Sequence, residues 1–171
     1  ASEIEVRLGA TWLDKKYIEQ FMYETFETPR YLRGQIEISY VPYTAEWQVS
    51  RKSMVRYNDV AAFTTYGTDR ASAYRLLEDA LNLRDIRIYD TIEDADGRER
   101  RVLNAKETTL AAQKQQLIRD AFKDWIWKDP ERRETLVRQY NEEMNSTRPR
   151  EYDGSHIVFS GMNPEITLRE H

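Results

Sequence analysis

Acidic side chains in the middle of the chain could hold a catalytic metal ion. A metal-dependent nuclease uses such carboxylates to bind a cation that activates water. Such a nuclease usually carries an acidic residue followed two positions later by lysine on a strand. The second strand of the β-hairpin predicted below has Glu99-Arg100-Arg101 instead. We therefore expect a solvated acidic face and keep a small metal-dependent nuclease as the less favoured alternative. Its candidate residues are Glu78, Asp79, Asp85, Asp90 and Glu99.

Other catalytic motifs are missing from the sequence. The chain has no cysteine, which excludes disulfides, cysteine-bound zinc and thiol catalysis. Of the two histidines, His171 is the last residue, and His156 has no second histidine or cysteine with which to share a metal. No glycine-rich phosphate loop and no Gly-x-Ser-x-Gly turn is present. We expect no catalytic residue, no metal and no cofactor within this chain.

Basic and aromatic side chains are concentrated between Lys123 and Arg150, where they could grip nucleic acid. Arginine and lysine neutralise phosphates, while an exposed aromatic ring stacks on a base. Acidic residues are interleaved with them, so a packed corner with a salt-bridged surface remains the competing interpretation. The candidates for nucleic-acid contact are Trp127, Lys128, Arg132, Arg133, Arg148 and Arg150.

The composition is that of a folded domain. A hydrophobic content of 40% in 171 residues is enough for one core. Charged residues make up 33% but nearly cancel at a net charge of −4, so a basic surface has to be local. The chain has no apolar run of about 18 residues and no charged-then-apolar start. We expect one soluble, cytoplasmic domain that makes no contact with a membrane.

Two helices are predicted in the first half of the chain. Apolar residues recur at helical spacing from about 13 to 26 and again from about 70 to 83. Thr68 or Asp69 could cap the second of these helices.

Two β-hairpins are also predicted, the first between these two helices and the second after them. Alternating apolar residues from Ile36 to Val49 predict the first. Ile86 and Ile88 begin the outgoing strand of the second, which Asp94-Ala95-Asp96-Gly97 turns back into a strand through residues 101–103. Gly97 supplies the positive φ that such a turn needs.

A long helix and a shorter one are predicted after the hairpins. Asn104, with Glu107 three residues later, resembles a capping box. Asp129-Pro130 then ends this helix and starts another that runs to about residue 144. The apolar face of the long helix is predicted to contain Leu110, Leu117, Ile118, Ala121, Phe122, Trp125 and Ile126.

Together these elements predict a single α+β domain with about four main helices and two β-hairpins. We place this domain, for which an accessory role is expected below, at residues 1–145. Residues 146–171 are polar and rich in turn-forming residues, and they predict an extended connector with one strand at 157–159.

Several stretches of the sequence resemble one known context. They are Arg7-Leu-Gly-Ala-Thr-Trp12, Tyr66-Gly-Thr-Asp-Arg70 through Leu83, Lys123-Asp-Trp-Ile-Trp-Lys-Asp-Pro130, and Asn145 through Pro164. They look like a segment of the very large DNA methylase/helicase proteins of bacterial conjugative elements and phages. In those proteins an adenine-specific methylase region precedes a Swi/Snf-like helicase. The ending from Pro164 to His171 is similar to the stretch just before the helicase phosphate loop, which predicts that the chain is a fragment leading toward an absent helicase domain.

The resemblance implies a role without a catalytic residue, because the family's methylase motif and helicase motifs fall outside these residues. ATP and S-adenosylmethionine are then expected only in the parent protein. We expect a non-catalytic accessory or linker domain, whose partners are the neighbouring methylase and helicase domains and DNA. A protein-interaction module is the alternative, and it predicts an exposed apolar patch that includes aromatic residues of the hairpins.

Overall fold

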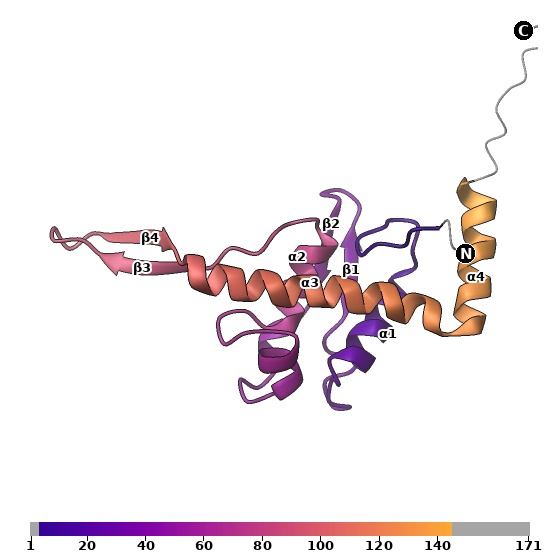
Figure 1. Cartoon of the computed structure of the whole chain (residues 1–171), viewed down its shortest axis with the longest axis horizontal. Coiled ribbons are helices and arrows are strands. Elements are labelled where there is room, and N and C mark those ends of the chain that lie inside the picture. The colour runs from indigo at the N-terminus through magenta and orange to yellow at the C-terminus, as the bar shows by residue number, and fades with distance from the viewer. Residues whose placement is uncertain (1–3, 145–171) are drawn as a thin grey trace, which may run out of the picture.

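Helix α3 (Ala105–Lys128) is the longest element of the computed structural model, which describes residues 4–144 (Figure 1). Helices α1 (Lys15–Thr25) and α2 (Ala73–Leu81) both contact α3. Helix α4 (Pro130–Met144) leaves the C-terminal end of α3 at a sharp corner. The core therefore lies where α1 and α2 meet α3.

The strands form two separate antiparallel hairpins. In the first, β1 (Ile38–Val41) contacts α1, and β2 (Glu46–Val49) contacts α2. In the second, β3 (Tyr89–Glu93) pairs with β4 (Glu99–Leu103) and extends beyond the N-terminal end of α3 (Figure 1). Between β2 and α2 the chain forms a 3-10 turn, η1 (Lys52–Met54), and a π-helical turn, η2 (Ala61–Thr65). The predicted α+β class, with four main helices and two hairpins, is confirmed.

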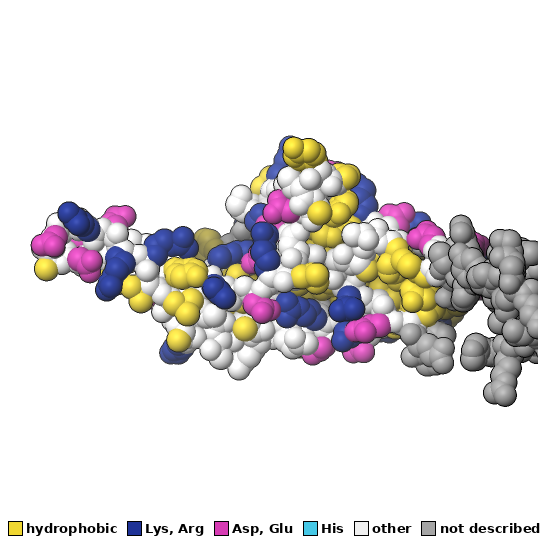
Figure 2. All heavy atoms as spheres, turned by 90° about the horizontal axis from the view of Figure 1, so that it is seen from above, with side chains coloured by type: hydrophobic (Ala, Val, Ile, Leu, Met, Phe, Trp, Pro, Cys, Tyr) yellow, Lys and Arg dark blue, Asp and Glu magenta, His cyan; other side chains and the backbone are white. Residues whose placement is uncertain are grey.

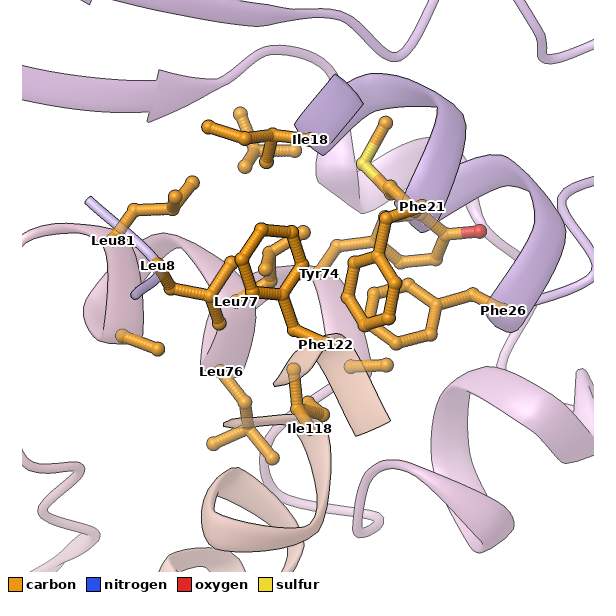
Figure 3. Close-up of a cluster of buried hydrophobic side chains, with 14 of the residues drawn as sticks. Leu8, Ile18, Phe21, Phe26, Tyr74, Leu76, Leu77, Leu81, Ile118 and Phe122 are labelled. Carbon is orange, nitrogen blue, oxygen red and sulfur yellow. The ribbon is translucent and has the colours of Figure 1, made fainter. Parts of the chain in front are cut away.

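Aromatic rings from three helical regions meet at the centre of the core (Figure 3). The ring of Phe21 lies edge-on to that of Phe122, with centroids 5.1 Å apart, and Phe26 meets Tyr74 in the same way at 5.3 Å. Edge-to-face pairs add about 0.5–1.5 kcal/mol to the area that they bury. The Tyr74 hydroxyl is hydrogen-bonded to the Thr28 hydroxyl at 2.6 Å, and burial raises the pKa of Tyr74 to about 12.

The two predicted helices of the first half are present, but the cap of α2 differs from the prediction. Ser72 is the N-cap, and its hydroxyl accepts a hydrogen bond from the backbone N–H of Arg75 at 3.3 Å. Thr68, one of the two predicted caps, instead accepts a hydrogen bond from the N–H of Ala71 at 3.1 Å. Thr68 therefore stabilises the turn before α2 and is not the N-cap of the helix.

Ile86 and Ile88 lie in an extended segment before β3 and are not part of a strand, which corrects the prediction. Both side chains are buried. The N–H of Ile86 donates to the side chain of Gln115 at 3.3 Å, and that of Ile88 donates to Thr108 at 2.9 Å. The alternating pattern thus reflects packing against α3, whose side chains replace the missing partner strand. The first hairpin likewise begins at Ile38 rather than at Ile36.

The buried face of α3 is rotated from the predicted one. Leu110 and Leu117 are exposed, whereas Gln115 is only 1% exposed. The Gln115 amide donates to the carbonyl oxygens of Arg84 at 2.9 Å and Leu76 at 3.4 Å. A buried amide is tolerated because both its oxygen, which accepts from the N–H of Ile86, and its nitrogen are hydrogen-bonded to backbone groups.

Both predicted caps around α3 and α4 are confirmed. Asn104 accepts a hydrogen bond from the N–H of Glu107 at 3.0 Å, and Asp129 accepts one from the N–H of Arg132 at 2.8 Å. Gly97 has the expected positive φ, 74°. The predicted connector at 146–171 lies outside the described residues. None of the described helices is long and apolar enough to cross a membrane.

Candidate nucleic-acid interface

The acidic residues proposed for a nuclease site are spread over the molecule. Within residues 4–144, no three His, Cys, Asp or Glu side chains are placed to share a metal ion. Burial raises the pKa of Asp79, whereas hydrogen bonds from Arg70 and Asn104 lower the pKa of Asp90. The metal site that the nuclease alternative requires is therefore not formed by its five candidates. Four of them face separate cations, in the pairs Glu78–Lys52, Asp79–Arg84, Asp85–Arg119 and Asp90–Arg70.

Arg132 stabilises the corner between α3 and α4 from the inside. Its guanidinium lies over the ring of Trp125, 3.6 Å from the centroid, and the residue is only 9% exposed. The guanidinium also donates to the carbonyl oxygens of Ile126, at 3.1 Å, and Trp125. Burial lowers the pKa of Arg132, and the neighbouring acids Asp129 and Glu24 oppose that shift. Because its donors are used within the corner, Arg132 does not offer them to a phosphate.

The remaining candidates at the corner are only partly available. The Arg133 guanidinium donates to the carbonyl oxygen of Trp127 at 3.1 and 2.7 Å, and the Trp127 side chain is half-buried. Lys128 is exposed and borders a hollow that also includes the carboxylate of Glu24. Two further candidates, Arg148 and Arg150, lie outside the described residues. The corner therefore contributes two exposed cations beside an acid.

A second surface is formed by the N-terminal segment where it crosses the end of α2. Gly9 has a φ of +86°, and a Cβ at this position would collide with the carbonyl oxygen of Leu81. A glycine is therefore required for the segment to approach the helix so closely. This contact places Arg7 and Leu8 beside α3.

The first part of this surface is a basic pocket of about 230 Å³. Arg7 comes from the N-terminal segment, while Arg119 and Lys123 lie one turn apart on α3. Among the described residues, the Lys123 ammonium has no hydrogen-bond or ion-pair partner. Three cations from two elements thus converge on one hollow. Its lining consists of Arg7, Leu8, Ala80, Leu83, Gln116, Arg119 and Lys123.

The ion pairs of this pocket are weak and open to solvent. Arg119 lies 3.3 Å from Asp85, whose side chain is 86% exposed, and Arg7 lies 4.0 Å from Glu5. Exposed pairs of this kind contribute about 0–1 kcal/mol. A phosphate could therefore replace the carboxylates at little cost to folding.

The second part is an aromatic pocket of about 480 Å³, which shares Arg7, Leu8 and Leu83 with the first. Trp12 and Tyr140 meet edge-on in its wall, with ring centroids 5.5 Å apart. The side chain of Gln139 donates to the carbonyl oxygen of Trp12 at 2.8 Å and so ties the N-terminal segment to α4. We call the two adjoining pockets the N-terminal groove.

Leu83 lies where the two pockets join and has an unusual backbone conformation. Its φ is +56°, although it is not a glycine, and its side chain is 76% exposed. The N–H groups of Leu83 and Arg84 bond back to Ala80, at 3.1 Å, and Asp79, at 2.8 Å, so Leu83 occupies the left-handed position that ends α2. Strained residues of this kind tend to occur at functional sites.

The surface view is consistent with a local rather than a global basic surface. Figure 2 shows Lys and Arg side chains scattered among hydrophobic and acidic ones over the body, and both signs of charge on the second hairpin. On this face the cations are therefore not gathered into a single basic patch.

A family model for a domain of unknown function, DUF8437, matches residues 7–146. The chain belongs to this family. No curated protein and no solved structure matches the chain. The matched range contains every residue named in the basic pocket, so that pocket lies wholly within the DUF8437 domain.

The groove of the DUF8437 domain is not apparent from the sequence. Arg7 and Trp12 are distant in sequence from α3, and only the fold brings them to Arg119 and Tyr140. Two signals were available: the spacing of four between Arg119 and Lys123, which places both on one face of a helix, and a glycine between Arg7 and Trp12. Neither signal specifies a partner without the tertiary structure.

Proposed function

We propose that this domain is a non-catalytic accessory module that contacts DNA within a larger DNA-modifying protein. The observation that carries the proposal is the N-terminal groove, in which three cations adjoin an aromatic pair. Cations supply the phosphate attraction that dominates nucleic-acid affinity, and aromatic rings supply contacts to bases. The resemblance to DNA methylase/helicase proteins supports the same role.

In this proposal the chemistry belongs to the neighbouring domains. The methylase and helicase regions of the parent protein would use S-adenosylmethionine and ATP, and the present domain would hold the DNA between them. Its own contribution is binding and positioning, for which a groove of fixed shape is sufficient.

The test is a titration of the 171-residue chain with labelled single- and double-stranded DNA at about 50 mM salt, where phosphate-driven binding is strongest. The variant to compare is Arg119→Ala/Lys123→Ala, which removes two cations from the groove. We expect it to weaken binding and to reduce the slope of log K against log salt by about 1.4–1.8, or about 0.7–0.9 for each lost phosphate contact.

The matched control is Arg98→Ala/Arg100→Ala. It removes the same charge from the exposed second hairpin, where Arg100 makes only a 3.7 Å pair with Asp94. We expect its DNA affinity and salt slope to match those of the unmodified chain. Equal losses in the two variants would assign binding to overall charge, and the absence of binding by the unmodified chain would end the proposal.

A protein-interaction module is the second candidate, and the second hairpin favours it. Both strands are exposed, and Tyr89, Ile92, Val102 and Leu103 expose between 36% and 49% of their surface. A two-stranded hairpin is only marginally stable alone, so a covering partner would stabilise it. Faster hydrogen exchange in β3 and β4 than in β1 and β2, with slowing after addition of a neighbouring domain but not of DNA, would favour this candidate.

A further inference from the structure

We infer that the N-terminal groove takes an unpaired DNA strand, with one phosphate in the basic pocket and one base against the rings of Trp12 and Tyr140. This inference rests on the proposed function and narrows it to one form of DNA. The groove supplies two different contacts side by side, a cationic one and an aromatic one, joined at Arg7 and Leu83. A nucleotide has a phosphate that matches the cationic contact and, beside it, a base that matches the aromatic one.

The basic pocket fits a single phosphate better than a long run of phosphates. Arg7 comes from the N-terminal segment and Arg119 and Lys123 come from α3, and the Lys123 ammonium has no other partner among the described residues. The guanidinium groups can each donate two hydrogen bonds to one phosphate, while the ammonium supplies a point charge. The carboxylates of Glu5 and Asp85, now 4.0 and 3.3 Å from Arg7 and Arg119, would be displaced by that phosphate and would then repel a second one at the rim.

The aromatic pocket is suited to a base that has left its stack. The Trp12 and Tyr140 side chains are half-buried, so each is held by packing while part of its ring faces the pocket. Exposed Leu83 adds an apolar contact between this pocket and the phosphate position. In a duplex the faces of the bases are covered by their neighbours, and only their edges are accessible. Ring contact therefore selects an unpaired strand.

The size of the groove agrees with this assignment. The aromatic part, about 480 Å³, lies in the range of pockets that bury small molecules, about 300–1,000 Å³, and the adjoining basic part is smaller, about 230 Å³. A pocket of that size accommodates one nucleotide unit. Reading a duplex would instead require an element that enters a groove about 12 Å wide, or an extended basic face.

The test compares three oligonucleotides of equal phosphate number on the 171-residue chain by fluorescence anisotropy: a single strand, a duplex, and a single strand with abasic sites in place of its bases. We expect the base-bearing strand to bind at least about fivefold more tightly than the abasic strand, which is the low end of the contribution of one stacked base. The duplex should bind no better than the abasic strand.

Two variants locate the base. Tyr140→Leu removes a ring, and we expect it to bring the affinity for the base-bearing strand down to that of the abasic strand, whereas Tyr140→Phe keeps the ring and the affinity. Binding should also quench tryptophan fluorescence, and Trp12→Phe should abolish that quenching. Thermal melting of each variant shows whether the fold is retained.

The outcomes separate this inference from the proposed function. If no DNA binds, both fail. If the abasic strand or the duplex binds as tightly as the base-bearing strand, the domain contacts DNA but the inference is wrong. Quenching that persists in Trp12→Phe would place the base elsewhere, near Trp125 or Trp127, and would also overturn it.

Discussion

The corner between α3 and α4 and the N-terminal groove both combine arginine with tryptophan, but they use these residues in opposite ways. At the corner, Arg132 lies over Trp125 and donates to two carbonyl oxygens, so its guanidinium is occupied by contacts within the domain. In the groove, Arg119 and Lys123 face a hollow and have at most an exposed ion pair. The same composition thus supports packing in one place and an open cationic surface in the other.

Arg132 and Arg119 differ because only Arg132 lies close to backbone carbonyls that are free to accept hydrogen bonds. The end of α3 leaves backbone carbonyls without helical partners, and Arg132, six residues after Ile126, folds back onto them. Arg119 lies in the middle of α3, where the carbonyls are already paired within the helix, and its guanidinium pairs instead with the exposed carboxylate of Asp85 at 3.3 Å. Proximity to a helix end therefore decides which arginine is structural.

Replacing Gly9 by alanine should have the largest effect on this comparison. The new Cβ would collide with the Leu81 carbonyl oxygen, and the alanine backbone would have to adopt a positive φ. We expect a loss of about 2–5 kcal/mol of folding free energy, measured by urea unfolding. Gly34→Ala is the control, because it also has a positive φ but no atom lies near its Cβ. Equal losses would show that strain alone, without the close contact, explains the effect.

Replacing Arg132 by alanine should be the next largest change. It leaves two carbonyl oxygens without the guanidinium and removes the contact with Trp125. We expect a loss of about 2–3 kcal/mol in folding free energy. DNA affinity of the folded variant should be unchanged, because Arg132 does not face the groove. A variant that keeps its stability but loses DNA binding would reverse the roles assigned to the corner and the groove.

Replacing Leu83 by glycine should have the smallest effect on stability, and in the opposite direction. Glycine adopts a φ of +56° without strain, so we expect a gain of about 0.5–1 kcal/mol in urea unfolding. Affinity for an unpaired DNA strand should fall, because the exposed side chain between the two pockets is lost. A variant that is both less stable and unchanged in binding would show that Leu83 serves packing alone.

The sequence predicts the helices, their caps at Asn104 and Asp129, and the turn at Gly97, because these features depend on residues close together in the chain. Features that depend on distant residues are missed. Ile86 and Ile88 show the alternation that is typical of a strand. The N–H of Ile86, however, donates to the side chain of Gln115 on α3 and not to a partner strand.

For the same reason the groove is not predicted from the sequence, and the described candidates Trp127, Lys128, Arg132 and Arg133 do not line it. Lys123 begins the basic stretch, but the residues that complete its pocket come from the N-terminal segment, the end of α2 and the middle of α3. The sequence predicts DNA contact for Arg132 because it shows the charge of this residue, whereas only the fold shows its burial against Trp125.

The most direct test of the difference between groove and corner is a residue-by-residue map of DNA contact. Backbone amide resonances of the 171-residue chain would be followed by NMR during titration with a short single-stranded oligonucleotide. We predict that the largest shifts fall on Arg7 to Trp12 and on residues 116–123 of α3. Largest shifts on Trp127, Lys128 and Arg133, or on the second hairpin, would contradict the assignment of DNA binding to the N-terminal groove.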